Sequence, residues 1–553
     1  GQLSVKGIAV PFTYQLDVTG LSGVDSGKII TADAAVRLIR DCDTIATGGF
    51  AGIGFAENIA VALEERFLAS KDASVDGFGS PQNLTLVFAA DQGDGKSRGL
   101  NHLGHDGLVG RVIGGGWSTV PRLRQLAVAN RIAAWSLPQG VISHLYRDIA
   151  AGKPGTLTRI GLGTFVDPRH GGGRLNEKAT NNLVSLMEID DEKYLFYKAF
   201  PINVGIIRGT TADSDGNITM DKEALILEAK AIAMAAHNSG GIVIAQVERI
   251  AARGSLKPQD VQVPGILVDC IVVAEKPEYH HQTYSEHYHP AFSGELRVPP
   301  AVIPSMPMSL EKIIARRAAM ELFPNSIVNL GAGISEGVAS IAVEERVIDQ
   351  ITLTGVYGSI GGYPAGKNFG VTTNAQAFQD QPSHFDFTDG GGIDIAFLSL
   401  GQVDSNGNVN VSKFGPRLVG ASGFINISQS ARKVVFTGLF ASGAMEVAFR
   451  KGNLHILRDG KVTQFVEAIE HRTFSSAEAH RLGTTVLYIT ERCVFRSATD
   501  GLELIEIAPG VDLQRDILDK LSFAPILRCQ PALMDERIFH EPTMDIRLDI
   551  QVL

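Results

Sequence analysis

The sequence predicts an α/β fold built from two related domains, each with an open, largely parallel β-sheet covered by helices. Three observations lead to this prediction. Short apolar segments typical of buried strands alternate with helical patterns along both halves of the chain. The 60 glycines among 553 residues suit the many tight strand-to-helix turns of such folds. Two sequence motifs also occur once in each half, which indicates an internal duplication.

The first repeated motif has the pattern G-x-G-x-x-E. It spans residues 52–57 and 331–336, and each copy follows a short apolar strand, expected at Thr44 to Ala46 and at Ile327 to Leu330. An apolar helical pattern ending in Glu-Glu-Arg follows each copy, so the motif marks a strand-to-helix turn. A dinucleotide-binding turn needs Gly or Ala at its last position, and the glutamate there argues against NAD or FAD.

The second repeated motif has the pattern of a hairpin turn. It reads Thr-Ala-Asp-Ser-Asp-Gly-Asn-Ile at 211–218 and Gln-Val-Asp-Ser-Asn-Gly-Asn-Val at 402–409. Gly and Asn supply the positive φ angles that such turns need, so we predict a β-hairpin in each domain. The stretch between the two motifs is much longer in the first half, which predicts an insertion between Ala90 and Pro201.

A segment between the two halves is rich in Pro, Tyr and His and has little periodicity. We interpret this segment, 277–307, as a linker packed on the surface between an N-terminal domain (1–276) and a C-terminal domain (308–553). The strand-rich tail from Phe440 onward belongs with the second domain. The linker histidines lack the helix or hairpin frame of a metal site, so we expect a solvated linker and no bound metal. They are His280, His281, His287 and His289.

The overall composition excludes several classes of protein. The formal net charge is −10 at pH 7, which gives no support for binding nucleic acid or an anionic membrane. Only 4 cysteines occur, far apart, so neither a disulfide framework nor a zinc site is expected. No apolar run approaches the ~18 residues of a membrane span, and no signal-peptide pattern is present, so we expect a cytoplasmic enzyme.

Six further stretches are specific enough to point to one protein family. They are residues 137–140, 161–169, 385–394, 411–415, 420–427 and 488–492. Together they resemble the family I CoA-transferases, in particular the bacterial short-chain acyl-CoA:acetate/3-ketoacid CoA-transferases, over nearly the whole chain. The resemblance implies an active site between two α/β domains, with an acyl-CoA and a small carboxylate as substrates. It also implies a role in ketone body or short-chain fatty acid metabolism, no tightly bound cofactor, and a homo-oligomer, either a dimer or a tetramer.

The segment 353–362 departs from the pattern of this family. In the family the strand end reads roughly T-V-E-T/S-G-x-I-G-G, and its glutamate attacks the thioester and carries CoA as a covalent glutamyl thioester. Alignment on the residues Gly358, Ile360, Gly361 and Gly362 puts Val356 at the position of that glutamate. A valine has no nucleophilic atom. The resemblance therefore implies acyl-CoA chemistry, while this position argues against the family's own route.

Two donors for an oxyanion are retained by the same resemblance. The family's glutamine amide corresponds to Gln139, and its glycine N–H corresponds to Gly423, with Gly420 as the alternative. Such donors stabilise the negative charge that develops on a thioester oxygen during attack. Close relatives often carry a histidine where this sequence has Gly116, before Trp117, so we expect a roomier pocket lined by these two residues.

Three further sets of residues are candidates for the site. Glu336 is either a replacement nucleophile or base, or, like Glu57 in the first copy, a carboxylate favoured by the helix dipole in a first turn. The phenol of Tyr357 could act as an acid or as a hydrogen-bond donor, although adjacent strand residues point to opposite faces, which would turn it away from the pocket of Val356. The resemblance implies CoA contacts at Gly358, Gly361, Gly362, Gly390, Gly391 and Gly392.

The reaction itself stays open at this stage. The resemblance implies transfer of CoA between an acyl-CoA and a carboxylate, by way of another residue if the nucleophile is lost. The alternatives are hydrolysis of an acyl-CoA, and decarboxylation or carbon–carbon cleavage through a stabilised enolate. The retained donors favour these alternatives because both pass through a negatively charged oxygen. A non-catalytic acyl-CoA-binding protein is a further alternative, and the fold alone does not choose among them.

Overall fold

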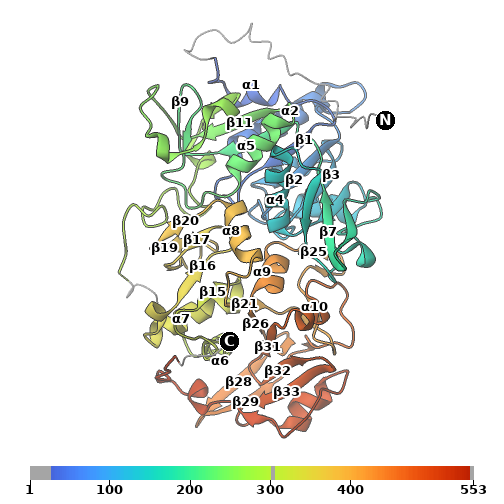
Figure 1. Ribbon diagram of the computed structural model, residues 1–553, viewed down its shortest axis with the longest axis vertical. Helices are drawn as coiled ribbons and strands as arrows, with labels where there is room; N and C mark the ends of the chain where they lie inside the picture. Colours follow the sequence, from blue (N-terminus) through green and yellow to red (C-terminus); the bar gives the residue numbers. More distant parts are fainter. Residues whose placement is uncertain (1–26, 300–304, 549–553) are drawn as a thin grey trace.

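The computed structural model describes residues 27–299 and 305–548 of the chain. Two open β-sheets, each with helices packed on it, form the two halves of the molecule (Figure 1). The half coloured blue to green holds the first sheet, and the half coloured yellow to red holds the second. The predicted α/β fold with two open sheets is confirmed.

The first sheet has seven parallel strands in the order β14-β11-β8-β1-β2-β3-β4. These strands are β1 (Thr44–Thr47), β2 (Leu84–Phe88), β3 (Val109–Gly114), β4 (Ala133–Ser136), β8 (Val204–Arg208), β11 (Ile242–Val247) and β14 (Cys270–Val273). Most of their residues are buried, as expected for a parallel sheet covered on both faces.

The second sheet has ten strands in the order β20-β17-β16-β15-β21-β26-β31-β32-β33-β34. Its central strands pair in parallel, whereas β17, β20, β32 and β33 each pair antiparallel with the neighbour nearer the centre. The strands are β15 (Ile327–Leu330), β16 (Thr352–Thr354), β17 (Ser359–Ile360), β20 (Ala377–Phe378), β21 (Ile395–Ser399), β26 (Lys433–Thr437), β31 (Thr485–Ile489), β32 (Cys493–Ala498), β33 (Gly501–Ile507) and β34 (Ala532–Leu533).

The remaining elements cover or extend these sheets. The helices are α1 (Ala32–Val36), α2 (Glu57–Ala73), α3 (Pro121–Val128), α4 (Gln139–Ala150), α5 (Ala229–Asn238), α6 (Leu310–Ala319), α7 (Gly337–Glu344), α8 (Gln381–Asp389), α9 (Phe424–Ser430) and α10 (Ser476–Arg481). The minor strands are β5 (Gly155–Thr158), β6 (Val184–Ile189), β7 (Glu192–Lys198), β9 (Thr211–Asp213), β10 (Ile218–Thr219), β12 (Arg249–Ala251), β13 (Val261–Val263), β18 (Tyr363–Pro364), β19 (Thr372–Thr373), β22 (Gln402–Val403), β23 (Val409–Asn410), β24 (Lys413–Phe414), β25 (Arg417–Leu418), β27 (Ala441–Ser442), β28 (Glu446–Arg450), β29 (Asn453–Arg458) and β30 (Val462–Thr463). Within the described ranges, none of the helices has the length and apolar character that a membrane crossing requires.

The two sheets repeat one arrangement of strands. The order β14-β11-β8-β1-β2 in the first corresponds to β31-β26-β21-β15-β16 in the second, with the same progression along the chain. This agreement supports the internal duplication read from the motifs. Between β2 and β8 the first half also carries β3, β4 and the small sheet β5-β7-β6, within the interval in which the insertion is predicted.

Both predicted hairpins are confirmed. Strand β9 pairs antiparallel with β10, and β22 pairs antiparallel with β23. The turn glycines Gly216 and Gly407 have φ angles of 91° and 88°, in the left-handed region that favours glycine. The aspartate that opens each turn, Asp213 or Asp404, accepts a hydrogen bond from the backbone N–H of the asparagine four residues later, at 3.0 and 2.9 Å.

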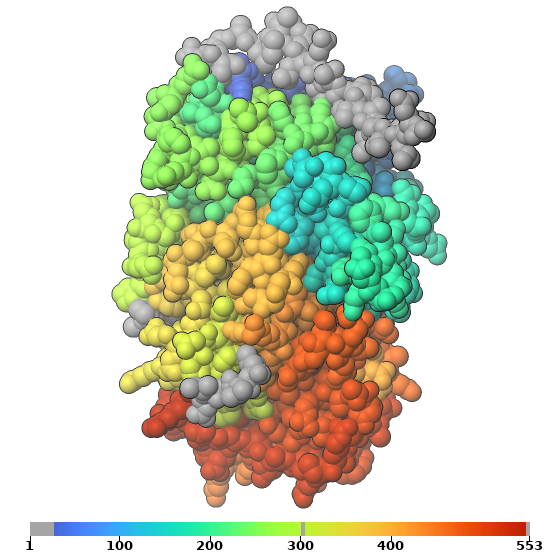
Figure 2. All heavy atoms as spheres, viewed as in Figure 1, coloured from blue at the N-terminus to red at the C-terminus, as the bar shows by residue number. Residues whose placement is uncertain are grey.

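Helix α4 carries the first predicted site residue to the boundary between the halves. Its first residue is Gln139, and four apolar side chains in the turns that follow are at most 2% exposed. They are Val141, Ile142, Leu145 and Tyr146. Burying each such side chain contributes about 1.5–3 kcal/mol, which fixes the helix firmly. It packs against α5 of its own half and against α8 and α9 of the other, and the two halves lie in close contact (Figure 2).

The segment after β14 is packed more deeply than a solvated linker would be. His280 is 7% exposed and Gln282 is 2% exposed. The Nε2 atom of His280 lies 3.5 Å from Oε1 of Glu223, which ties this segment to the first half.

In residues 27–299 and 305–548, no group of three or more His, Cys, Asp or Glu side chains could hold a metal ion.

Candidate functional site

Two loops, one from each half, meet at the candidate site and form what we call the interdomain seam: residues 115–117 after β3 and residues 419–423 before α9. An isolated antiparallel bridge joins Gly116 to Gly420 across the seam. The backbone N–H of Ser422 also donates to the carbonyl of Gly115 at 2.9 Å. The ends of elements from both sheets are therefore held in a fixed relation by backbone hydrogen bonds.

Gln139 lies directly against this seam. Its backbone N–H donates to the carbonyl of Ser422 at 2.9 Å, and its side chain is fully buried. Neither polar atom of its side-chain amide has a hydrogen-bond partner within the described residues. A buried amide without a partner costs about 1–3 kcal/mol. Such a cost is tolerated where a ligand supplies the missing partner, so the amide is a candidate donor to substrate.

Gly423 and Val356 lie beside this amide. A Cβ atom placed on Gly423 would lie 3.5 Å from Oε1 of Gln139 and only 2.5 Å from Cγ1 of Val356. Only glycine fits at position 423 without displacing the valine. The structure thus brings together the two predicted oxyanion donors and the residue at the predicted nucleophile position. Gly420, the alternative donor, instead lies against the carbonyl of Gly115. A Cβ placed on Gly420 would lie 2.6 Å from that carbonyl oxygen.

A small cavity of about 40 Å³ opens beside Val356. Glu336 and Tyr357 also line it. Burial raises the pKa of Glu336 to about 7, so this carboxyl would exchange its proton near neutral pH. Glu336 also lines a larger cavity of about 510 Å³ with Phe292, an apolar neighbour. The carboxyl therefore lies between two spaces near the predicted nucleophile position.

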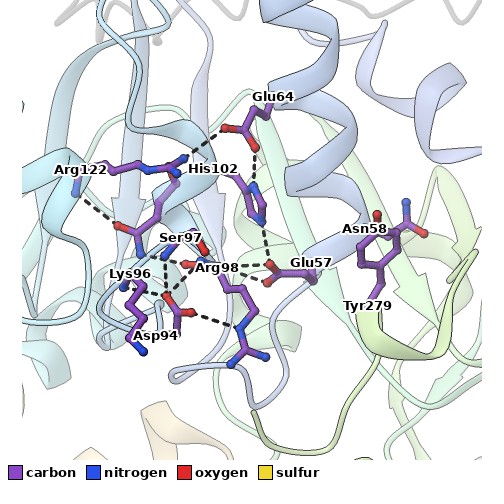
Figure 3. A network of polar contacts seen from close by, with 12 residues as sticks. Glu57, Asn58, Glu64, Asp94, Lys96, Ser97, Arg98, His102, Arg122 and Tyr279 are labelled. Carbon is purple, nitrogen blue, oxygen red and sulfur yellow. Dashed lines mark hydrogen bonds and ion pairs between the residues drawn. The ribbon is translucent and has the colours of Figure 1, made fainter.

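Glu57, the counterpart of Glu336 in the first copy, has a different environment (Figure 3). Its carboxylate accepts hydrogen bonds from the N–H of Gly99 at 3.1 Å and lies 2.7 Å from Nε2 of His102. The other ring nitrogen of His102 lies 2.5 Å from Glu64. Burial alone would lower the pKa of His102, but the two glutamates raise it to about 9. Glu57 thus belongs to a structural network, and the two glutamates have different surroundings although their motifs match.

Tyr357 differs from the expectation that it would point away from Val356. Both residues line the same small cavity. Strand β16 ends at Thr354, so residues 355–358 form a turn in which side chains do not alternate between two faces. The ring of Tyr357 is 6% exposed and stacks on Phe50, with ring centroids 3.8 Å apart.

The glycines predicted to contact CoA fall into two groups. Gly361 lines the small cavity, and Gly358 and Gly362 have φ angles of 111° and 71° in the adjoining turns. The second group lies after α8, where Gly390 and Gly391 line a separate cavity of about 360 Å³. This cavity is also lined by the basic residues Arg159, Arg432 and Arg481. A CoA molecule that contacts both groups of glycines would have to reach both cavities. These contacts stay a prediction.

Asp91 is a site residue that sequence reasoning missed. It follows β2, and its Oδ1 accepts backbone hydrogen bonds from Ser118 at 2.9 Å and Thr119 at 3.2 Å. Its Oδ2 lies only 2.0 Å from the position of a Cβ on Gly116. The expected roomier pocket at Gly116 is therefore wrong, because the carboxylate fills that space. Burial raises the pKa of Asp91. The ring of Trp117 is fully buried and lines none of the cavities described above.

Ser422 is the second residue that sequence reasoning missed. Its φ angle is 46°, in the left-handed region that is uncommon for residues with a side chain. Its Oγ donates a hydrogen bond to Oδ2 of Asp91 at 3.1 Å, across the two halves. Nothing in the local sequence Gly-Ala-Ser-Gly-Phe indicates that the serine, and not a glycine, takes the strained conformation.

Comparison with known proteins gives a consistent result. The family profile described as Coenzyme A transferase matches residues 29–274. The chain is 46% identical to caffeate CoA-transferase of Acetobacterium woodii over 520 residues, which cover 93% of this chain and 98% of that protein. The crystal structure of the acyl-CoA transferase YdiF from Escherichia coli O157:H7, as apoenzyme, superposes with a TM-score of 0.89 at 39% identity, covering 94% of this chain and 98% of that one. A thioester complex of YdiF with CoA superposes with a TM-score of 0.88, also at 39% identity and with the same coverage.

Proposed function

This chain is an enzyme of the coenzyme A transferase family, and from that premise we propose that it binds an acyl-CoA between its two halves and hydrolyses the thioester. In this proposal no CoA becomes linked to residue 356, because the side chain there is a valine. The acyl carbonyl lies against the interdomain seam, and the carboxylate and free CoA are the products. The relative YdiF, in contrast, is described in a thioester complex with CoA.

The observation that supports this proposal most strongly is the buried amide of Gln139 beside Gly423 and Val356, which has no partner among residues 27–299 and 305–548. In the proposed complex, the amide and the N–H of Gly423 donate to the thioester oxygen. Attack on the carbonyl carbon turns that oxygen into an oxyanion, and each such donor is worth roughly 3–4 kcal/mol in the transition state. The methyl groups of Val356 pack beside the carbonyl and cannot compete for its carbon.

Transfer of CoA between an acyl-CoA and a carboxylate is the activity that the family relatives support. The 46% identity to caffeate CoA-transferase favours it, and so does the position of Glu336 in the cavity beside Val356. In this version Glu336 acts as the nucleophile in place of residue 356. Its raised pKa of about 7 leaves a substantial ionised fraction at neutral pH.

Product analysis separates these candidates. The purified protein is incubated with a panel of acyl-CoAs, with and without acetate, and free thiol and acetyl-CoA are measured. We expect thiol release without acetate, matched by an equal amount of free carboxylate. Acetyl-CoA that forms only with acetate, without thiol release, would contradict hydrolysis and favour transfer. Tight binding of an acyl-CoA with neither product would favour a non-catalytic binding protein.

A further inference from the structure

The serine in the interdomain seam, Ser422, has three features that are unusual together in one residue. Ser422 has a φ angle of 46°, is partly exposed, and is followed directly by the candidate oxyanion donor Gly423. A left-handed conformation costs a residue with a side chain about 1–2 kcal/mol. Such strain persists only where the surroundings fix it, and it is often found at functional sites. Here the Ser422 N–H and carbonyl bond to Gly115 and Gln139, each at 2.9 Å, and fix the backbone.

The hydroxyl of Ser422 has an acidic neighbour suited to accept its proton. Its Oγ lies 3.1 Å from Oδ2 of Asp91. The other carboxylate oxygen, Oδ1, is held by the backbone and hydroxyl groups of Ser118 and Thr119, at 2.9 to 3.3 Å. This arrangement orients the carboxylate and directs Oδ2 toward the serine. Because Gly116 has no side chain, the Oδ2 of Asp91 and the Oγ of Ser422 can occupy the space beside it.

We propose that Ser422 is the nucleophile of thioester cleavage and that Asp91 is its general base. A nucleophile needs a base within hydrogen-bond reach and oxyanion donors within about 3 Å of the reacting oxygen. Oγ of Ser422 contacts Asp91, and the carbonyl of Ser422 accepts a hydrogen bond from the backbone N–H of Gln139, the residue whose side-chain amide is the other candidate donor. A serine on a strained turn, followed by a residue whose N–H serves the oxyanion, is an arrangement used by serine hydrolases. This inference rests on the proposed hydrolysis.

The proposed reaction needs only the acyl-CoA and water as reactants. Oγ of Ser422 forms a bond to the thioester carbonyl carbon while its proton passes to Oδ2 of Asp91. The tetrahedral oxyanion collapses, the carbon–sulfur bond breaks, and the leaving CoA sulfur takes the proton from Asp91. A water molecule then attacks the acyl-serine ester and gives a proton to Asp91. Collapse breaks the bond to Oγ, which regains that proton, and the free carboxylic acid departs.

The experiment traps the acyl-enzyme. The full-length protein is mixed with a branched-chain acyl-CoA, quenched in acid during turnover, and digested for peptide mass mapping. We expect a mass increase equal to the acyl group on the peptide that contains Ser422. The variant Ser422→Gly keeps the left-handed backbone, which glycine adopts without strain, and should fold normally. It should lose the adduct and release thiol about a thousandfold or more slowly.

Further variants test the base and the specificity of the effect. Asp91→Asn should also slow thiol release strongly, whereas Ser422→Cys should form an acyl adduct on sulfur. Ser383→Ala, at an exposed serine of α8, is the matched control and should behave as the unaltered protein. Equal thiol release by Ser422→Gly and the unaltered protein would overturn the serine mechanism and leave hydrolysis by direct water attack in place. No thiol release by the unaltered protein from any acyl-CoA would overturn both proposals.

Discussion

At the scale of single residues, the candidate site combines an inert side chain with a buried amide that has no partner within the described residues. Val356 contributes only methyl groups, yet its Cγ1 lies against Gly423 and near the buried amide of Gln139. An amide buried without a partner lowers stability, so its presence is explained best by a substrate oxygen that pairs with it. The two observations together favour a site that polarises a thioester without attacking it through residue 356.

Replacing Gln139 by leucine should raise stability and lower activity. The variant removes a buried amide whose two polar atoms have no partner in the described part of the chain, so the free energy of unfolding should rise by about 1 kcal/mol. Loss of one oxyanion donor should slow thioester cleavage by about 10²–10³-fold. Urea unfolding and a thiol-release assay measure the two effects.

Gln429→Leu provides a matched control for this substitution. The side chain of Gln429 accepts from Gly161 at 2.6 Å and donates to Leu162 at 2.9 Å, so both of its polar atoms are paired. The control should therefore lower stability, in contrast to Gln139→Leu. A fall in stability for Gln139→Leu as well, with unchanged activity, would show that its amide has a structural role only.

A carboxylate introduced at position 356, the predicted nucleophile position, should create covalent chemistry with CoA. Val356→Glu places an acid beside Gly423 and Gln139, where an acyl anhydride formed from it can be attacked by the CoA thiolate. Intact-mass analysis after incubation with acyl-CoA should then detect a CoA-sized increase. The variant Val356→Gln has a similar size but cannot form this adduct. No adduct on Val356→Glu would indicate that this residue does not face the thioester.

At the scale of elements, α2 is linked to the loop before β3 by the glutamate and histidine network of Figure 3. His102 lies between Glu57 and Glu64, and a second histidine, His105, also contacts Glu64 at 2.6 Å. Burial alone would raise the pKa of Glu64, but hydrogen bonds from the two histidines lower it to about 2. The network therefore stabilises the packing of α2 only while its members keep opposite charges.

Removal of His102 should expose this pH dependence. The pKa of His102 rises from 6.5 to about 9 on folding, so its stabilisation is complete below about pH 6.5 and is lost as the pH rises through 9. The pKa of Glu64 falls from 4.5 to about 2, so its part is present above pH 4.5 and lost as the pH falls toward 2. His102→Gln should lower the free energy of unfolding by about 3 kcal/mol near pH 6.

Denaturant unfolding across the pH range measures this effect. The difference between His102→Gln and the unaltered protein should shrink as the pH is raised from 6.5 past 9. His170→Gln, at an exposed histidine, should show no such pattern. A difference that stays constant from pH 5 to about pH 10 would contradict the charged network.

The elements also mark how far the sequence could predict the structure. Periodicity and turn residues predicted β15 with its observed bounds and both hairpins, because these signals lie within a few neighbouring residues. The sequence could not predict the end of β16 at Thr354, which brings Tyr357 to the cavity of Val356. It also could not predict that Asp91 fills the space at Gly116, since that contact depends on how β2 and β3 end side by side.

At the scale of the whole molecule, the candidate site exists only when the two halves are packed together. Gln139 comes from α4 of the first half, and Gly423 and Val356 come from the second. The residue after Gln139, Gly140, donates its N–H to Oδ1 of Asn426 in α9 at 3.0 Å. The packing of α4 on α8 and α9 therefore fixes the distance between the donors.

A methyl group at Gly140 should disturb this packing. Its Cβ would lie 2.4 Å from Nδ2 of Asn426 and 2.5 Å from the ring of Phe385, so the halves would have to separate slightly. Gly140→Ala should lower activity by at least about 100-fold, because a small displacement of the donors removes their effect. Hydrogen exchange at residues 419–423 should become faster, while both sheets stay protected.

The control for this substitution is Gly48→Ala. A Cβ at Gly48 would meet no atom closer than 3.6 Å, which is an ordinary contact. This variant should keep both its activity and its slow exchange at the seam. Normal activity of Gly140→Ala would contradict a site that depends on close packing of the halves.

The most direct measurement for the whole account is a crystal structure of the protein with a non-hydrolysable acyl-CoA analogue. We predict that the carbonyl oxygen lies about 3 Å from the amide of Gln139 and the N–H of Gly423, with the methyl groups of Val356 beside the acyl carbon. A carboxylate oxygen of Glu336 or another acid within bonding reach of that carbon would contradict the account. The enzyme would then transfer CoA through a covalent glutamyl or aspartyl thioester.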